Sequence, residues 1–266
     1  MENELFWVIA SALLAVGATN VAWLIGRVLP QLGRAARARS RKSSMAALRW
    51  LAAALFLLLP PLIAWRYGAL SLYAMGLSDL DWLGNVWTGG PLMALIAALL
   101  VFGWLVYRRT RPNSLRTRVS WQADVAPWQL TPLDAALRKW HWAFYRAGFI
   151  GWIAAGFPPL GASAGAAPLV QLVEGLRQDP VYWGCWLGLG LVAVEWGSNP
   201  FARRGWRDRP EGAALSAALA FATTGLFATT RNFWLCLACH VIAATPIAAW
   251  FALAPGEASP AIRANE

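Results

Sequence analysis

The stretch that decides the fold is residues 213–253, which read AALSAALAFATTGLFATT, then Arg231-Asn232, then FWLCLACHVIAATPIAAWFAL. Each of the two apolar runs is close to the ~20 residues that a helix needs to cross the hydrocarbon core of a bilayer. Only Arg231 and Asn232 separate the runs, which indicates a tight turn between two helices. This region is therefore predicted to be a membrane-spanning helical hairpin.

Five further apolar runs lie upstream, and together they predict an all-α, polytopic transmembrane bundle of about seven spans, with eight as the alternative. Gly156, Pro158 and Pro159 interrupt the fourth run, so its helix is expected to kink or end there. Residues 131–139 open with Thr-Pro-Leu-Asp, which predicts an interfacial helix leading into that span. The predicted spans are Leu5–Leu29, Ala46–Trp65, Pro91–Tyr107, Trp140–Ala162, Val181–Gly197, Ala213–Thr230 and Phe233–Leu253.

The composition favours the same class of protein. The chain of 266 residues is 58% hydrophobic and 14% charged, and its mean hydropathy is +0.46. A soluble domain of this length would have no way to bury so much apolar surface, so the excess is expected to contact lipid. The 18 tryptophans agree, because Trp is concentrated at membrane–water interfaces. No internal repeat divides the chain, which predicts one integral membrane domain over residues 1–266.

Lys and Arg are concentrated in every second connection between the predicted spans. The positive-inside rule then places the N-terminus outside and the C-terminus in the cytoplasm, in a multi-pass protein of the bacterial inner membrane. Spread over loops, the net charge of +10 indicates contact with anionic lipid and argues against nucleic-acid binding. The basic connections hold Arg34, Arg37, Arg39, Arg41, Lys42, Arg108, Arg109, Arg111, Arg116, Arg118, Arg138, Lys139, Arg203, Arg204, Arg207 and Arg209.

Four ionisable side chains fall within the apolar runs: His141, Arg146, Glu195 and His240. Such groups are costly in lipid and usually face the interior of a bundle, so together they are the candidate functional site. Each also has a purely structural interpretation. Arg146 and Glu195 would neutralise each other as an ion pair, His141 would be solvated at the interface beside Lys139, and His240 would be a core histidine bonded to a carbonyl.

Cys236-Leu-Ala-Cys239-His240 matches the C-x-x-C-H pattern of covalent haem attachment, with His240 as the axial ligand. The pattern lies inside an apolar span, whereas haem attachment normally occurs on water-exposed chain. The alternative is two buried thiols beside a histidine, since Cys is among the most buried residue types. A haem- or pigment-binding subunit is therefore the weakest of three functional hypotheses.

The run from His141 to Phe149, HWAFYRAGF, resembles the Glu-Glu-x-x-x-Arg motif of the CPBP family, also called the Abi family. That family holds the CAAX prenyl endopeptidases and bacteriocin-processing proteins. Arg146 and the Gly148-Phe149 pair agree with its usual form, whereas His141 and Trp142 replace the two glutamates. The family's Phe-x-x-x-His motif falls on Leu191–Glu195, where Glu195 replaces the histidine.

The closing region resembles the family most. Gly225 and the threonines that follow it lead through Asn232 and Trp234 into His240, in the manner of the family's His-x-x-x-Asn motif, but Ala244 replaces the final Asn. The resemblance covers roughly residues 131–254. It implies a membrane-embedded endopeptidase that activates water with a glutamate and histidines, described as glutamic or metal-dependent. An imidazole and a carboxylate have exchanged places, so His141, Glu195 and His240 would still be a ligand set for Zn²⁺ or Fe²⁺ if they converged.

Because both motif glutamates and the Asn are replaced, the leading hypothesis is a degenerate, non-catalytic member of this family. It would be an accessory or scaffold subunit that binds other membrane protein subunits and lipid. The alternative is an active intramembrane endopeptidase with Glu195 as general base and His141, Arg146 and His240 as acid, cation or ligands.

Overall fold

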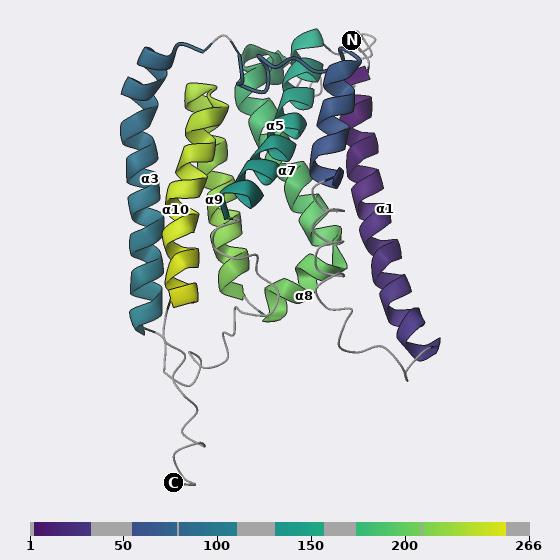
Figure 1. The fold of residues 1–266 in the computed structure, drawn as a ribbon. Coiled ribbons are helices and arrows are strands. Elements are labelled where there is room, and N and C mark those ends of the chain that lie inside the picture. Colours follow the sequence, from purple (N-terminus) through teal and green to yellow (C-terminus); the bar gives the residue numbers. More distant parts are fainter. Residues whose placement is uncertain are drawn as a thin grey trace.

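The computed structural model describes residues 3–32, 55–78, 80–110, 131–156, 174–208 and 210–253, and within these ranges its regular secondary structure is entirely helical (Figure 1). The prediction of an all-α fold is confirmed. A helical segment, Leu55–Arg66, and a single turn at residues 174–178 complete the described helices. The main helices are α1 (Asn3–Leu32), α3 (Trp82–Thr110), α5 (Thr131–Ala155), α7 (Pro180–Ser198), α8 (Pro200–Asp208), α9 (Pro210–Thr230) and α10 (Phe233–Leu253).

Three of the described helices, rather than seven, are long and apolar enough to be candidate membrane spans: Glu4–Leu24, Trp82–Tyr107 and Pro210–Thr230. Each of the other predicted spans overlaps a described helix that differs from a candidate span in composition or length, and residues 46–54 and 157–162 of these spans lie outside the described residues. The α5 helix carries Asp134, Arg138, Lys139 and Arg146, and Glu195 lies in α7. The apolar parts of Leu55–Arg66 and Phe233–Ile247 are shorter.

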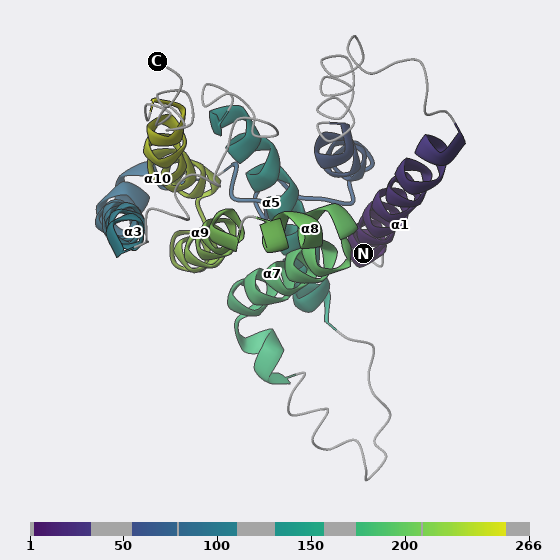
Figure 2. The same cartoon turned by 90° about the horizontal axis from the view of Figure 1, so that it is seen from below.

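The α5 helix lies at the centre of the molecule and positions the candidate site (Figures 1 and 2). It packs against α7, α10 and α1, while α9 packs against α3, α7 and α10. Almost every residue of α5 from Lys139 to Gly148 is buried, which is unusual for a segment with two cationic side chains. The polar residues of this segment therefore face other helices and not the outer surface.

The turn between α9 and α10 consists of Arg231 and Asn232, which confirms the predicted tight helical hairpin. Arg231 adopts a left-handed conformation with φ 52°, and the Asn232 side chain accepts hydrogen bonds from the backbone N–H groups of Trp234 and Leu235 at 2.9 and 3.1 Å. Asn232 thus caps α10 by satisfying donors that have no partner within the first helical turn.

The prediction for residues 131–139 is wrong in one respect. They form the first turns of α5 itself and not a separate interfacial helix, and Ala135, Leu137 and Lys139 are buried. The end of the helix is as predicted: α5 stops at Ala155, and Gly156 follows with φ +81°, a conformation that glycine adopts without strain. Pro158 and Pro159 lie outside the described residues.

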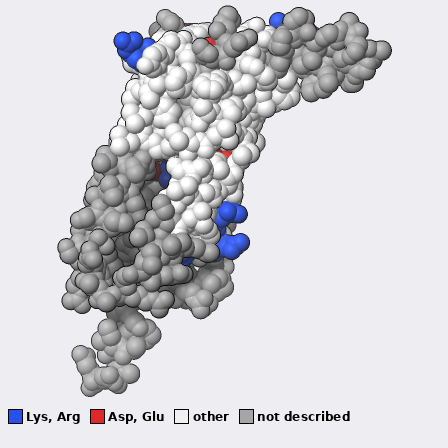
Figure 3. All heavy atoms as spheres, turned by 90° about the vertical axis from the view of Figure 1, so that its right-hand side faces the viewer, with Lys and Arg blue, Asp and Glu red and all other residues white. Residues whose placement is uncertain are grey.

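The outer surface of the bundle is apolar. Leu13 and Leu14 of α1 are 68% and 63% exposed, and Leu83 and Trp87 of α3 are 87% and 85% exposed. Figure 3 shows one face on which charged side chains gather toward the two ends and are scarce between them. This pattern is expected where lipid contacts the surface. The protein therefore has the features of an integral membrane protein.

Candidate functional site

Polar residues occupy two different faces of α5. Successive residues of an α-helix are 100° apart, so His141 and Tyr145 share one face, whereas Lys139, Trp142 and Arg146 share another. The first pair faces Glu195 of α7. The second group reaches α9, where Lys139 contacts Thr223 and Arg146 contacts Phe227. The four residues predicted as one site are therefore divided between two separate clusters.

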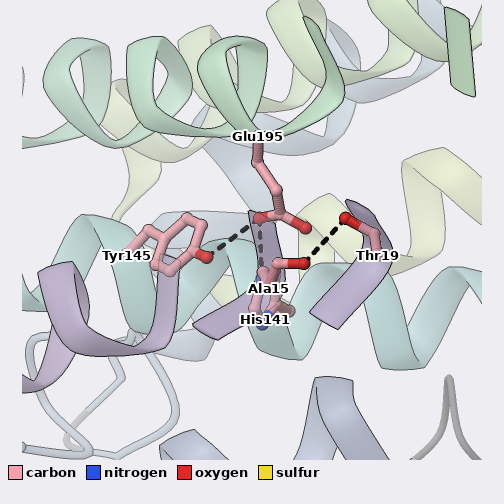
Figure 4. A network of polar contacts seen from close by, with 5 residues as sticks. All are labelled: Ala15, Thr19, His141, Tyr145 and Glu195. Atoms are coloured by element: carbon pink, nitrogen blue, oxygen red, sulfur yellow. Dashed lines mark hydrogen bonds and ion pairs between the residues drawn. The ribbon is translucent and has the colours of Figure 1, made fainter. Parts of the chain in front are cut away.

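The first cluster, which we call the Glu195 centre, consists of His141, Tyr145 and Glu195. The Tyr145 hydroxyl donates a hydrogen bond of 2.9 Å to Glu195 Oε2, and His141 Nε2 lies 3.1 Å from the same oxygen. The His141 side chain is 2% exposed and that of Glu195 is 14% exposed. Figure 4 shows the Glu195 carboxylate with both α5 side chains pointing toward it.

The contacts of His141 fix how its two ring nitrogens are used. An ionised Glu195 accepts hydrogen bonds only, so Nε2 of His141 carries the proton toward it. The other nitrogen, Nδ1, is buried and has no hydrogen-bond partner among the described residues. The ring also packs on Phe56 and Tyr145, with centroid distances of 5.3 and 4.4 Å. The Glu195 centre is thus a carboxylate–imidazole pair in which Nδ1 of His141 has no partner among the described residues.

The second cluster, which we call the cationic pocket, consists of Lys139, Trp142, Arg146, Thr223, Thr224 and Phe227. Lys139 donates a hydrogen bond to the Thr223 hydroxyl, and its ammonium lies 4.1 Å from the centre of the Trp142 ring. The Arg146 guanidinium lies 3.9 Å from the centre of the Phe227 ring. Aromatic faces attract cations, so both contacts are favourable, but neither supplies a negative charge.

His240 lies on the side of the cationic pocket and not in the Glu195 centre. Its ring is 6.1 Å from that of Trp142, it is 6% exposed, and its Nδ1 has no partner in the described part of the chain. Trp142 therefore lies beside His240, whereas His141, one residue earlier, turns toward Glu195. The two histidines are kept apart by the geometry of α5.

These positions correct two interpretations made from the sequence. Arg146 and Glu195 do not form the expected ion pair, because Tyr145 and Arg146 are adjacent and only Tyr145 points at Glu195. His141, Glu195 and His240 do not form a metal site, since no three His, Cys, Asp or Glu residues come together to hold a metal ion within the described ranges. The residues present thus do not fit Zn²⁺ or Fe²⁺.

The C-x-x-C-H residues do not fit a covalently attached haem. Cys236 and Cys239 are fully buried free thiols. The Cys236 thiol lies 3.3 Å from the Thr223 carbonyl oxygen of α9, and that of Cys239 lies 4.0 Å from the Met93 carbonyl oxygen of α3. The facing helices occupy the space that a haem would need beside these thiols.

Sequence reasoning missed the roles of Tyr145, Lys139 and Thr223. Lys139 was expected at the interface but is 0% exposed. Helical spacing could have identified two of them. Tyr145 follows His141 by four residues, and Lys139, Trp142 and Arg146 are spaced by three and four, so each set lies on one helix face. Thr223 has no such signal, because its role depends on how α9 packs.

Comparison with known proteins adds no assignment: no protein-family model, curated protein or solved structure matches the chain. The resemblance to the CPBP family therefore stays a prediction that depends on the motifs quoted above.

Proposed function

We propose that the protein is a degenerate, non-catalytic relative of the CPBP membrane proteases that serves as an accessory subunit in a membrane complex. The observation that carries this proposal is the division of the motif residues between two faces of α5. His141 contacts Glu195, while Arg146 and His240 lie in and beside the cationic pocket. A peptidase needs its base and the cation that stabilises the oxyanion at one reacting carbonyl.

The proposal includes a multi-pass topology with the N-terminus outside. In Figure 1, the carboxyl-terminal ends of α1, α3 and α10 lie at the same end of the molecule as α8. Exposed Arg203 and Arg207 on α8 place positive charge at this end, which the positive-inside rule assigns to the cytoplasm. The basic residues at positions 34–42, 111–118 and 209 lie outside the described residues. The α5 helix would cross as an interior helix, with α7, α10 and α1 packed against it.

The test is isolation of the protein from its native membrane in mild detergent, with a peptidase assay on the same preparation. We expect fixed amounts of other membrane subunits to co-purify. The Glu195→Gln variant should keep these subunits, because glutamine has nearly the same shape and still accepts a hydrogen bond from Tyr145. A protein that purifies alone and cleaves a membrane peptide in a Glu195-dependent manner would contradict the proposal.

The Glu195 centre favours a second candidate function, an intramembrane endopeptidase. Glu195 orients His141, and the free Nδ1 could accept a proton from a water molecule that attacks a peptide carbonyl. The same imidazole would then return the proton to the leaving amine. For this function, Glu195→Gln should lower kcat at least about 100-fold, whereas the same change at an exposed glutamate, Glu174→Gln, should leave kcat unchanged.

A further inference from the structure

The cationic pocket contains more positive charge than its neighbours balance. Lys139 is 0% exposed and Arg146 is 2% exposed. Within the described ranges neither forms an ion pair with Asp or Glu, and the nearby carboxylate of Glu195 is engaged by His141 and Tyr145 on another face of α5. Buried charges are costly unless they are paired, so a negative charge close to Lys139 and Arg146 would stabilise this arrangement.

Arg146 also has hydrogen-bond donors to offer. Its Nε and Nη2 atoms are buried and have no hydrogen-bond partner in the described part of the protein. The contact with Phe227 covers the plane of the guanidinium, whereas its N–H groups point outward within that plane. Leaving these N–H donors without an acceptor costs more free energy than leaving neutral donors unpaired, because they belong to a charged group.

A small cavity lies between α5, α7 and α9, and Arg146 forms part of its wall. It is lined by Trp142, Arg146, Gly188, Leu189, Val192 and Thr224, and its free volume of about 10 Å³ is the room that one water-sized particle needs. Gly188 has no side chain to fill this space, and a Cβ there would lie 3.0 Å from the Cα of Arg146. The cavity is too small for sulfate, phosphate or a lipid headgroup.

We propose that this cavity binds one single-atom anion, a halide such as chloride, which the Arg146 guanidinium holds through its free N–H groups. Lys139 adds a second positive charge behind Trp142 and increases the attraction, which is strong in an apolar interior. The anion lowers the net charge of the cationic pocket and allows α5, α7 and α9 to pack closely. The Glu195 centre is not involved, so the proposal is independent of the proposed function.

The test is thermal unfolding of the purified protein while chloride replaces gluconate at constant ionic strength. Saturable binding should raise Tm by about 3–5 °C at ten times the Kd. The Arg146→Gln variant should lose this rise, whereas Arg203→Gln, the same change at an exposed site on α8, should keep it. Sulfate should have no comparable effect, because it does not fit the cavity.

A second measurement uses the unaltered protein, because Arg146→Gln also changes the packing on Phe227. Bromide soaked into crystals should give one anomalous difference peak beside the Arg146 guanidinium. A Tm that does not respond to chloride, a rise that persists in Arg146→Gln, or the absence of a bromide peak at this position would each overturn the proposal.

Discussion

Lys139 shows how much a single contact can matter inside an apolar bundle. Its fully buried ammonium has one hydrogen-bond acceptor among the described residues, the hydroxyl of Thr223, and that hydroxyl in turn donates to the Leu219 carbonyl at 2.5 Å. The chain Lys139–Thr223–Leu219 therefore connects a cation on α5 to the backbone of α9. Its loss should be felt in the stability of the whole bundle.

We predict that Thr223→Val lowers the free energy of unfolding by about 3 kcal/mol, because valine keeps the shape but leaves the buried ammonium without an acceptor. Thr229→Val is the matched control. The Thr229 hydroxyl is on the exposed side of α9 and bonds only to carbonyls of its own helix, Gly225 and Leu226. Thermal unfolding in detergent measures both. Equal losses in the two variants would show that Thr223 has no special role.

The residues of the site could be predicted from the sequence only in part. Apolar surroundings identified His141, Arg146, Glu195 and His240 as interior residues, and Arg146, His141 and His240 are buried. Which of these residues meet depends on the rotation of α5 about its axis. Two interpretations made from the sequence ignored this rotation. One paired Arg146 with Glu195, and the other placed both histidines beside Glu195. Lys139 was misplaced because a lysine at the edge of an apolar run normally reaches toward water.

At the scale of elements, the closest packing is between α5 and α7. A Cβ at Gly184 would lie 2.8 Å from the backbone N of Ile150, and one at Gly188 would lie 3.0 Å from that of Arg146. The two glycines are four residues apart on α7, as Ile150 and Arg146 are on α5. Such close approach is typical of small residues between membrane helices, while Gly190 has open space around it.

We predict that Gly184→Ala separates α5 from α7 and lowers the free energy of unfolding by about 1–3 kcal/mol. Because Ile150 and Arg146 lie along this contact, the strain should extend to the cationic pocket. Gly190→Ala has the same chemistry on the exposed side of α7 and should cost nothing measurable. Denaturant or thermal unfolding distinguishes the two variants, and a Gly190→Ala loss as large as that of Gly184→Ala would refute the packing argument.

The elements themselves could be predicted well, and their crossing of a membrane less so. Each predicted range overlaps a described helix, and the two-residue turn at Arg231-Asn232 follows from its place between two long apolar runs. Fewer helices than predicted are candidate spans, because α5 and α7 carry ionisable residues and two other apolar helices are short. The α5 helix, for example, contains two buried cations, so its own sequence is not uniformly apolar although its surroundings are.

At the scale of the whole molecule, the three cysteines report on how tightly the bundle is closed. Cys185, Cys236 and Cys239 are all 0% exposed and free. We predict that none reacts with a maleimide in the folded protein and that all react after denaturation in SDS, since reaction requires an accessible thiolate. Arg203→Cys on exposed α8 should react in both states. Labelling of Cys236 or Cys239 in the folded protein would contradict the packing of α10 against α9 and α3.

The burial of two cations on one face of α5 has a consequence for the synthesis and membrane insertion of the protein. The ribosome completes α5 before it begins α7, α9 and α10, yet Lys139 and Arg146 are covered by side chains of α9. Before those later helices are inserted, the charged groups of Lys139 and Arg146 would contact the hydrocarbon. Insertion scales put the free-energy cost at about 3 kcal/mol for each charge. If α5 crosses the membrane as proposed, chains truncated before α9 should therefore be poorly integrated and rapidly degraded.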